Sequence, residues 1–304
     1  MLQYRSIYDA KKVFGKVFMK KYLKLMRVHH YIKNLLVFAA LACSGQMFNL
    51  EKLRSGITAF IAFCMISSVV YIINDIRDCE KDKKHPTKCK RPIAAGLISI
   101  RRAWILAIIL LSIAIVCNAF SFHTSSTLLL VLYLSINLAY SFGLKNIPIV
   151  DITILVSGFL IRILYGAFVT EITISNWLYL TVIALSFYFA LGKRRNELKN
   201  INGSETRQVL KEYPIDFLDK NMGMCLTLAN VFYALWSMDE KTAAFYKNNN
   251  LIFTVPIILL ITMKYSLDVE GESDGDPVEV LLHDKILLSL CILYLAVMFM
   301  ILYI

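Results

Sequence analysis

Three aspartates stand at the end of a long apolar stretch, with a spacing that suits the binding of a divalent cation. The stretch covers residues 57–73 and is followed by Asn74, Asp75, Asp78 and Asp82. On a helix the three aspartates would lie within about 60° of one another, with Asn74 at the edge of the same face. Three like charges on one face repel each other, and a hard cation such as Mg²⁺, which takes oxygen ligands, removes that repulsion. The spacing therefore predicts a metal site with Asp75, Asp78 and Asp82 as its ligands.

A basic segment follows the aspartates. It contains Lys83, Lys84, Lys88, Lys90 and Arg91. Such a run suits a phosphate-bearing anion carried by the metal, because hydrogen bonds from Lys and Arg to phosphate are strong. A solvated cytoplasmic loop is the alternative interpretation, since basic loops flank the cytoplasmic ends of membrane spans. That alternative leaves the helical spacing of the carboxylates unexplained, so we expect a metal-and-phosphate site at a membrane surface.

The elements that must position these residues are membrane-spanning helices. Of the 304 residues, 58% are hydrophobic, and the mean hydropathy is +0.60. Soluble domains contain a smaller fraction of apolar residues. In this chain the apolar residues are grouped in blocks that are near the length of a membrane span. The predicted spans are 34–50, 56–73, 103–121, 125–142, 150–169, 176–192, 222–238, 250–263 and 286–303. We therefore expect an all-α, polytopic bundle of about nine transmembrane helices around a central cavity.

The distribution of basic residues predicts the orientation of the bundle. With a cytoplasmic N-terminus, 28 of the 33 Lys and Arg residues fall in the cytoplasmic segments 1–33, 74–102, 143–149, 193–221 and 264–285. This is a strong positive-inside signal, so we expect the cavity to open to the cytoplasm from the inner membrane. Residues 1–33 are predicted to form a basic amphipathic segment at the interface, and residues 34–304 a single transmembrane catalytic domain. The net charge is +11, and the basic residues lie between the predicted spans. This placement favours the bilayer and anionic substrates as partners over nucleic acid.

A second polar segment ends the sixth predicted span, at what would be its cytoplasmic end. It contributes Tyr188, Lys193, Arg194 and Glu197. Because the second and sixth spans would cross the membrane in the same direction, both polar segments are expected to face one cavity. The alternative is a span flank that carries an ion pair between Lys193 and Glu197.

One arginine lies inside an apolar span. Arg162 stands near the middle of the block 150–169. A charge at that depth is costly unless it faces a wet or charged interior, so we expect Arg162 to face the cavity and to meet an anion there. Asp151 begins the same block, either as a helix N-cap or as a further polar group of the site.

The first polar segment resembles a known family. Asn74-Asp75-x-x-Asp78-x-x-x-Asp82 is similar to the first aspartate-rich motif of the UbiA-type intramembrane prenyltransferase superfamily. Its continuation, His85-Pro86-x-Lys88-x-x-Arg91-Pro92-Ile93-Ala94-Ala95-Gly96, resembles the decaprenyl-phosphate phosphoribosyltransferase branch. Four shorter pieces agree with that branch: Lys33-Asn34, Gly158-x-x-x-Arg162, Lys193-Arg194-x-x-Glu197 and Gly275-Asp276-Pro277-x-Glu279.

The chain departs from the family pattern in two places. Arg27-Val28-His29-His30-Tyr31 stands where Arg-Pro-x-x-Trp is expected. The second aspartate-rich motif of the aromatic prenyltransferases is absent, and Lys193-Arg194-Arg195-x-Glu197 takes its place. A donor with a further phosphate on a sugar is better met by fixed cations than by a second acidic cluster. The second departure therefore favours the phosphoribosyl branch.

The resemblance implies a membrane-embedded pentosyltransferase. It would use Mg²⁺ to transfer 5-phosphoribosyl from 5-phosphoribosyl 1-diphosphate to a polyprenyl phosphate of the decaprenyl type, as in cell-envelope biosynthesis. Asp75, Asp78 and Asn74 would be catalytic, with Asp75, Asp78 and Asp82 as metal ligands. The implied substrate-binding residues are Lys33, Lys83, Lys88, Arg91, Arg162, Tyr188, Lys193, Arg194 and Glu197. Among these, Lys88 and Arg91 would bind the diphosphate, Lys193 and Arg194 the 5-phosphate, and Arg162 the lipid phosphate.

Two other functions stay open from the sequence. One is a UbiA-type prenyltransferase that moves a prenyl group from a prenyl diphosphate to an aromatic or other small acceptor. The other is a transporter of anionic metabolites, which the intramembrane Arg162 and a basic cytoplasmic mouth would also suit. Homo-oligomerisation is likewise left open.

Overall fold

The computed structural model describes residues 19–120, 124–199, 208–246, 250–271 and 277–303, and these ranges contain helices and no strand. The all-α prediction is therefore confirmed for the described part. Most of the predicted segment 1–33 and the pair Gly275-Asp276 lie outside the described residues. The chain divides into two compact units: unit 1 comprises residues 1–35 and 58–138, and unit 2 comprises residues 36–57 and 139–304.

Unit 1 is built from one long helix, most of two others, and short connecting elements. They are η1 (Val28–His30), α2 (Tyr31–Asn34), most of α4 (Leu50–Arg77), α5 (Cys79–Lys84), η3 (Lys88–Lys90), α6 (Ile100–Ala119) and most of α7 (Thr124–Phe142). Ser99 caps α6 by accepting a hydrogen bond from the backbone N–H of Arg102. Small residues on one face of α6, including Ala103 and Ala107, pack with Val69 of α4 in the core. The other face of α6 exposes isoleucines, as expected of a helix in contact with lipid.

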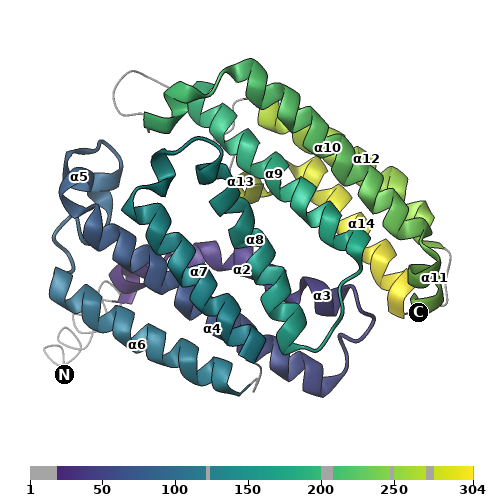
Figure 1. Cartoon of the computed structure of the whole chain (residues 1–304), viewed down its shortest axis with the longest axis horizontal. Coiled ribbons are helices and arrows are strands. Elements are labelled where there is room, and N and C mark those ends of the chain that lie inside the picture. The colour runs from purple at the N-terminus through teal and green to yellow at the C-terminus, as the bar shows by residue number, and fades with distance from the viewer. Residues whose placement is uncertain (1–18, 121–123, 200–207, 247–249, 272–276, 304) are drawn as a thin grey trace, which may run out of the picture. The chain divides into compact units, whose positions relative to one another are not determined.

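Unit 2 contains the remaining helices. They are η2 (Leu35–Phe38), α3 (Ala39–Ala42), η4 (Leu144–Asn146), α8 (Val150–Val169), α9 (Asn176–Lys199), η5 (Gln208–Glu212), α10 (Ile215–Met238), α11 (Glu240–Tyr246), η6 (Asn250–Thr254), α12 (Val255–Glu270), α13 (Pro277–His283) and α14 (Lys285–Tyr303). In Figure 1, α9 and α10 run side by side, and α12 lies along α10. The main core joins Tyr188 of α9, Leu218 of α10 and Val269 of α12.

A glycine lets α8 approach the segment before α3 closely. A Cβ atom on Gly166 would lie 1.8 Å from the backbone oxygen of Val37, a distance no side chain can adopt. Only glycine fits this contact, because the two backbones touch directly. The close approach fixes one end of α8, and the other end of α8 carries Asp151.

The number of predicted spans is only partly confirmed. Within the described ranges, six helices are long and apolar enough to cross a membrane: α4, α6, α7, α8, the segment 250–270 formed by η6 and α12, and α14. Helices α9 and α10 are long enough, at 24 residues each, but carry more polar side chains along their length. The predicted span 34–50 is instead broken into short helices and a turn at Gly45, whose φ is +65°.

Candidate active site

The predicted aspartates lie where one helix of unit 1 passes into the next. Asn74 and Asp75 belong to the last turn of α4, Asp78 is the N-cap of α5, and Asp82 lies within α5. The N–H of Asp78 bonds to the carbonyl of Asn74 at 2.9 Å, and the N–H of Asp82 bonds to the carbonyl of Asp78 at 2.8 Å. This i to i−4 pattern continues across the break, so the predicted helical spacing of the carboxylates is largely preserved.

Two of the three carboxylates are buried and converge on one arginine. Asp75 is 2% exposed and Asp82 is 4% exposed. The Nη1 atom of Arg91 lies 2.7 Å from Oδ2 of Asp82 and 3.2 Å from Oδ1 of Asp75. A buried carboxylate without a counter-ion is strongly disfavoured, and here a single guanidinium serves both. Arg91, predicted to bind phosphate, therefore lies between the predicted metal ligands.

Arg27 completes this cluster, although its role was not predicted from the sequence. Its Nη2 atom lies 2.7 Å from Oδ1 of Asp75, and its guanidinium lies 4.7 Å from the centre of the Tyr71 ring. Its backbone has a φ of 53°, in the left-handed region that non-glycine residues seldom adopt. Such strain persists where the surroundings hold a residue in place, and it is frequent at functional sites. The only sequence signal was that Arg27 opens the segment that departs from the family pattern.

The cluster suits a divalent cation in its donor type. Carboxylate oxygens are the ligands that Mg²⁺ prefers, and the oxygens of Asp75 and Asp82 already contact a common cationic nitrogen. In the described part of the chain, however, no three acidic, histidine or cysteine side chains gather closely enough to hold a metal ion. The predicted set of three aspartates is therefore not assembled, and Asp75 and Asp82 are the pair that fits.

The other predicted residues of unit 1 are less buried than Asp75 and Asp82. Lys83 pairs with Glu80 at 2.7 Å on the surface of α5, and Lys88 is exposed in η3. Lys33 is half-buried on α2, next to Asn34. The buried amide of Asn34 donates to Ser67 of α4 at 3.1 Å, which fixes α2 against α4. Lys83 and Lys88 thus lie at the surface, whereas the two carboxylates are buried.

In unit 2, Arg194 is buried and engaged by three partners. Its side chain is 0% exposed. Its guanidinium donates to Asp151 at 2.6 Å, to Glu197 at 2.8 Å and to the hydroxyl of Tyr140 at 3.3 Å. Each guanidinium nitrogen thus has an acceptor within the protein. This arrangement is typical of a structural residue rather than of a ligand-binding one. The predicted contact of Arg194 with a phosphate would require these partners to give way.

The carboxylate of Asp151 also bonds to Tyr213, which lies in a different segment of the chain from Arg194. The hydroxyl of Tyr213 donates to Asp151 at 2.6 Å and accepts from the N–H of Ile149 at 2.5 Å. Burial raises the pKa of Tyr213 to about 12, so that the hydroxyl stays protonated and donates. Of the two alternatives for Asp151, the N-cap is wrong, because Ile149 is the N-cap of α8 and the carboxylate of Asp151 bonds to side chains. A role at the site stays a prediction.

The remaining predicted residues of unit 2 differ in exposure. Lys193 and Glu197 are half-buried on α9. Tyr188 is buried in the core, with its ring 5.8 Å from that of Tyr265. Arg162 is buried in α8 and donates to the carbonyl of Gly158 in the same helix at 2.5 Å. The geometry therefore leaves Lys193 as the predicted cation of unit 2 with the best access to a ligand.

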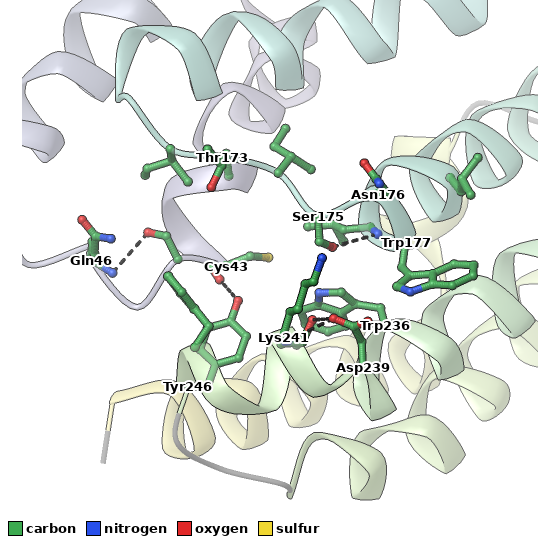
Figure 2. A pocket seen from close by; sticks show the side chains of 18 of the residues that line it. Cys43, Gln46, Thr173, Ser175, Asn176, Trp177, Trp236, Asp239, Lys241 and Tyr246 are labelled. Atoms are coloured by element: carbon green, nitrogen blue, oxygen red, sulfur yellow. Dashed lines mark hydrogen bonds between the residues drawn. The ribbon is translucent and has the colours of Figure 1, made fainter.

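A cavity of about 620 Å³ lies in unit 2 at the opposite ends of α8, α9 and α10 from Arg194. Figure 2 shows Trp177, Trp236, Lys241 and Tyr246 around it. The positive-inside orientation predicts that this end faces away from the cytoplasm. None of the residues predicted from the sequence to bind substrate lines it.

Comparison with known proteins identifies the family to which the chain belongs. Residues 35–266 match the UbiA prenyltransferase family. The decaprenyl-phosphate phosphoribosyltransferase of Mycolicibacterium smegmatis is 34% identical over 282 residues, which cover 87% of each chain. The enzyme of the same name from Corynebacterium glutamicum is 32% identical and covers 93% of this chain and 86% of its own. Among solved structures, a UbiA homologue from Archaeoglobus fulgidus bound to GPP and Mg²⁺ has a TM-score of 0.67 at 18% identity and covers 93% of this chain and 99% of its own.

Proposed function

Because the chain belongs to the UbiA prenyltransferase family, we propose that it is a membrane-embedded phosphoribosyltransferase. It transfers 5-phosphoribosyl from 5-phosphoribosyl 1-diphosphate to a polyprenyl phosphate and releases diphosphate. The observation that carries this proposal is the 34% identity to a decaprenyl-phosphate phosphoribosyltransferase along 87% of both chains. The basic segment around Lys193, in place of a second acidic motif, supports the same reaction.

The proposed reaction exchanges one bond at C1 of the ribose for another. The bond from C1 to the diphosphate breaks, and the electron pair leaves with the diphosphate. An oxygen of the lipid phosphate forms the new bond to C1. A phosphate monoester is already anionic near neutral pH, so the reaction needs no general base. The main demand on the protein is to stabilise the negative charge that grows on the leaving diphosphate.

The residues of unit 1 meet that demand in this proposal. Mg²⁺, when bound, would neutralise the leaving diphosphate, and Asp75 and Asp82 are the residues to hold it, with Asp78 from the sequence motif. Asn74 lies in the same turn of α4 as Asp75 and would orient the bound group. Lys88 and Arg91 would bind diphosphate oxygens, with support from Lys83.

For unit 2 the proposal keeps the roles predicted from the sequence, with one change. Lys193 would bind the 5-phosphate of the donor, and Arg162 the phosphate of the lipid. Arg194, engaged by Asp151, Glu197 and Tyr140, is proposed as a positioning residue that fixes the end of α9 next to Lys193. We also propose that the enzyme is a multi-pass protein of the inner membrane whose active site faces the cytoplasm, as the positive-inside distribution indicates.

The test is an assay with the purified protein in detergent. Donor labelled in the ribose is incubated with polyprenyl phosphate, with and without Mg²⁺, and label is measured in the lipid fraction. The proposal expects Mg²⁺-dependent labelling of the lipid. A parallel reaction with geranyl diphosphate and an aromatic acceptor should give no product. Prenyl transfer in the second reaction, with none in the first, would overturn the proposal in favour of a prenyltransferase.

A further inference from the structure

Two arginines serve the buried aspartates of unit 1, and they are held in different ways. Arg27 contacts Asp75 alone, whereas one nitrogen of Arg91 contacts both Asp75 and Asp82. Both arginine side chains retain some exposure, 19% for Arg27 and 25% for Arg91. The difference between them lies in what else fixes each side chain.

Arg27 is fixed from several directions. The Tyr71 ring covers its guanidinium, and its left-handed backbone is locked by hydrogen bonds on both sides. Its own N–H bonds to the carbonyl of Lys24 at 3.3 Å, and its carbonyl accepts from the N–H of His30 at 2.8 Å. A change of rotamer would therefore forfeit the ring contact as well as the ion pair with Asp75. Arg27 behaves as a permanent counter-ion.

Arg91 makes its ion pairs with the two carboxylates. Within the described residues, the interactions of its side chain are those with Asp75 and Asp82. Its backbone is extended, with a φ of −67° and a ψ of 143°, between the short helix η3 and Pro92. Unlike Arg27, Arg91 has no aromatic ring over its guanidinium among the contacts of the described residues, so the group can leave the carboxylates when a stronger anion is offered. Guanidinium groups bind phosphate oxygens through two parallel hydrogen bonds, which makes a diphosphate such an anion.

We propose that Arg91 is an exchangeable counter-ion that makes the binding of a divalent cation at Asp75 and Asp82 depend on the binding of diphosphate. Without donor, Arg91 occupies the position between the two carboxylates and competes with the metal for their oxygens. When diphosphate binds, the guanidinium moves to it and the carboxylates become available to the cation. Arg27 stays on Asp75 throughout and keeps that side chain in place. This inference rests on the proposed function, because it takes diphosphate as the ligand.

The physical reason for such an exchange is the repulsion between the two carboxylates. Asp75 and Asp82 are both buried, and both contact one nitrogen, so their charges need a cation near both oxygens at all times. Arg91 supplies that cation until the metal replaces it. By thermodynamic linkage, whatever diphosphate contributes to metal affinity the metal contributes equally to diphosphate affinity. The enzyme thereby avoids holding a metal without its substrate.

The test measures metal binding directly and needs no turnover. Mn²⁺ replaces Mg²⁺ as the probe, and protein-bound Mn²⁺ is measured by equilibrium dialysis of the full-length protein in detergent, with and without inorganic diphosphate. Free Mn²⁺ is calculated from a protein-free blank that contains the same diphosphate. For the wild type we expect weak binding of Mn²⁺ alone and a gain with diphosphate of about 5- to 150-fold, the usual range for coupled sites.

Three variants separate exchange from a structural role. Arg91→Gln should bind Mn²⁺ more tightly than the wild type when diphosphate is absent, and its gain with diphosphate should be smaller than that of the wild type. Arg91→Lys, which retains the charge, should keep the weak binding of the wild type. Arg27→Gln is the matched control and should bind Mn²⁺ no more tightly than the wild type. Thermal unfolding in detergent confirms that each variant is folded.

The inference is overturned if Arg91→Gln binds Mn²⁺ alone as weakly as the wild type or more weakly, while it remains folded. Such a result would make Arg91 a fixed structural tie. Because the probe is inorganic diphosphate, the outcome is separate from that of the proposed function. Coupled binding of Mn²⁺ and diphosphate without transfer of phosphoribose would retain the exchange and reject the reaction.

Discussion

Pairs of arginine and buried aspartate occur in both units, but the arginines differ in their exposure and in their number of partners. In unit 1, Arg27 contacts Asp75, Arg91 contacts both Asp75 and Asp82, and both arginine side chains are partly exposed. In unit 2, Arg194 is fully buried, and three acceptors from three segments use all of its nitrogens. Arginine–aspartate pairs therefore differ between the units. In unit 1 two arginines share buried carboxylates, which is the arrangement we propose to be exchangeable. In unit 2 each nitrogen of one arginine already has an acceptor, which is the arrangement of a structural tie.

Removing the cation of unit 2 should have the largest effect, and it should act on stability. Arg194→Ala leaves Asp151 buried without its cationic partner, and breaking such a pair costs about 3–5 kcal/mol. We expect a large fall in the unfolding temperature in detergent. The comparison is Arg91→Ala in unit 1, where Arg27 stays on Asp75 as a second counter-ion, so we expect a smaller loss of stability. Equal losses from the two variants would erase the distinction between the two clusters.

Removing a carboxylate of unit 1 should act on catalysis. Asp75→Asn keeps the size of the side chain and removes a ligand for the cation that stabilises the leaving group. Groups of that kind typically contribute about 10²- to 10³-fold to kcat. We expect at least this loss in the transfer assay, with an unfolding temperature near that of the wild type. A variant that melts early but retains its rate per folded molecule would place Asp75 among the structural residues.

The hydroxyl of Tyr213 should contribute less, again to stability. Tyr213→Phe removes one hydrogen bond to the buried Asp151, and bonds to charged groups are worth about 1.5–3 kcal/mol. The pKa of Tyr213 is raised from 10.0 to about 12, so its contribution is complete below about pH 10 and is lost as the pH rises towards 12. Thermal unfolding of the wild type and of Tyr213→Phe should therefore converge in that alkaline range. A constant difference up to pH 12 would contradict the assigned hydrogen bond.

The smallest effect is expected at Lys83. It pairs with Glu80 on the surface of α5, and exposed pairs of this kind contribute little to stability. Lys83→Gln should leave the unfolding temperature unchanged and should reduce donor affinity only slightly, as a supporting charge. A loss as large as that of Asp75→Asn would mean that Lys83 contacts the donor directly.

Sequence patterns predicted the local features of the molecule well. The helical class follows from apolar blocks, and the spacing of Asp75, Asp78 and Asp82 follows from helical periodicity, which continues across the break at Asp78. The count of nine spans is less secure, because α9 and α10 mix polar and apolar residues. The segment 34–50 is apolar in composition yet turns at Gly45, and composition alone does not reveal such a turn.

The partners of the charged residues could not be predicted, because they come from distant parts of the chain. Arg27 lies 48 positions from Asp75, and Asp151 lies 43 positions from Arg194 and 62 from Tyr213. Periodicity places a residue on a face of its own helix, but it does not say which other helix meets that face. For this reason Arg194 was predicted to bind phosphate, and Arg27 was not predicted as part of the site.

The central claim is the transfer of phosphoribose, and a doubly labelled donor tests it most directly. The donor carries ¹⁴C in the ribose and ³²P in the β-phosphate, and the purified protein is supplied with polyprenyl phosphate and Mg²⁺. We predict that ¹⁴C enters the lipid fraction while ³²P stays in the aqueous fraction as diphosphate, in equal amounts. Transfer of both labels to the lipid, or of neither, would contradict it.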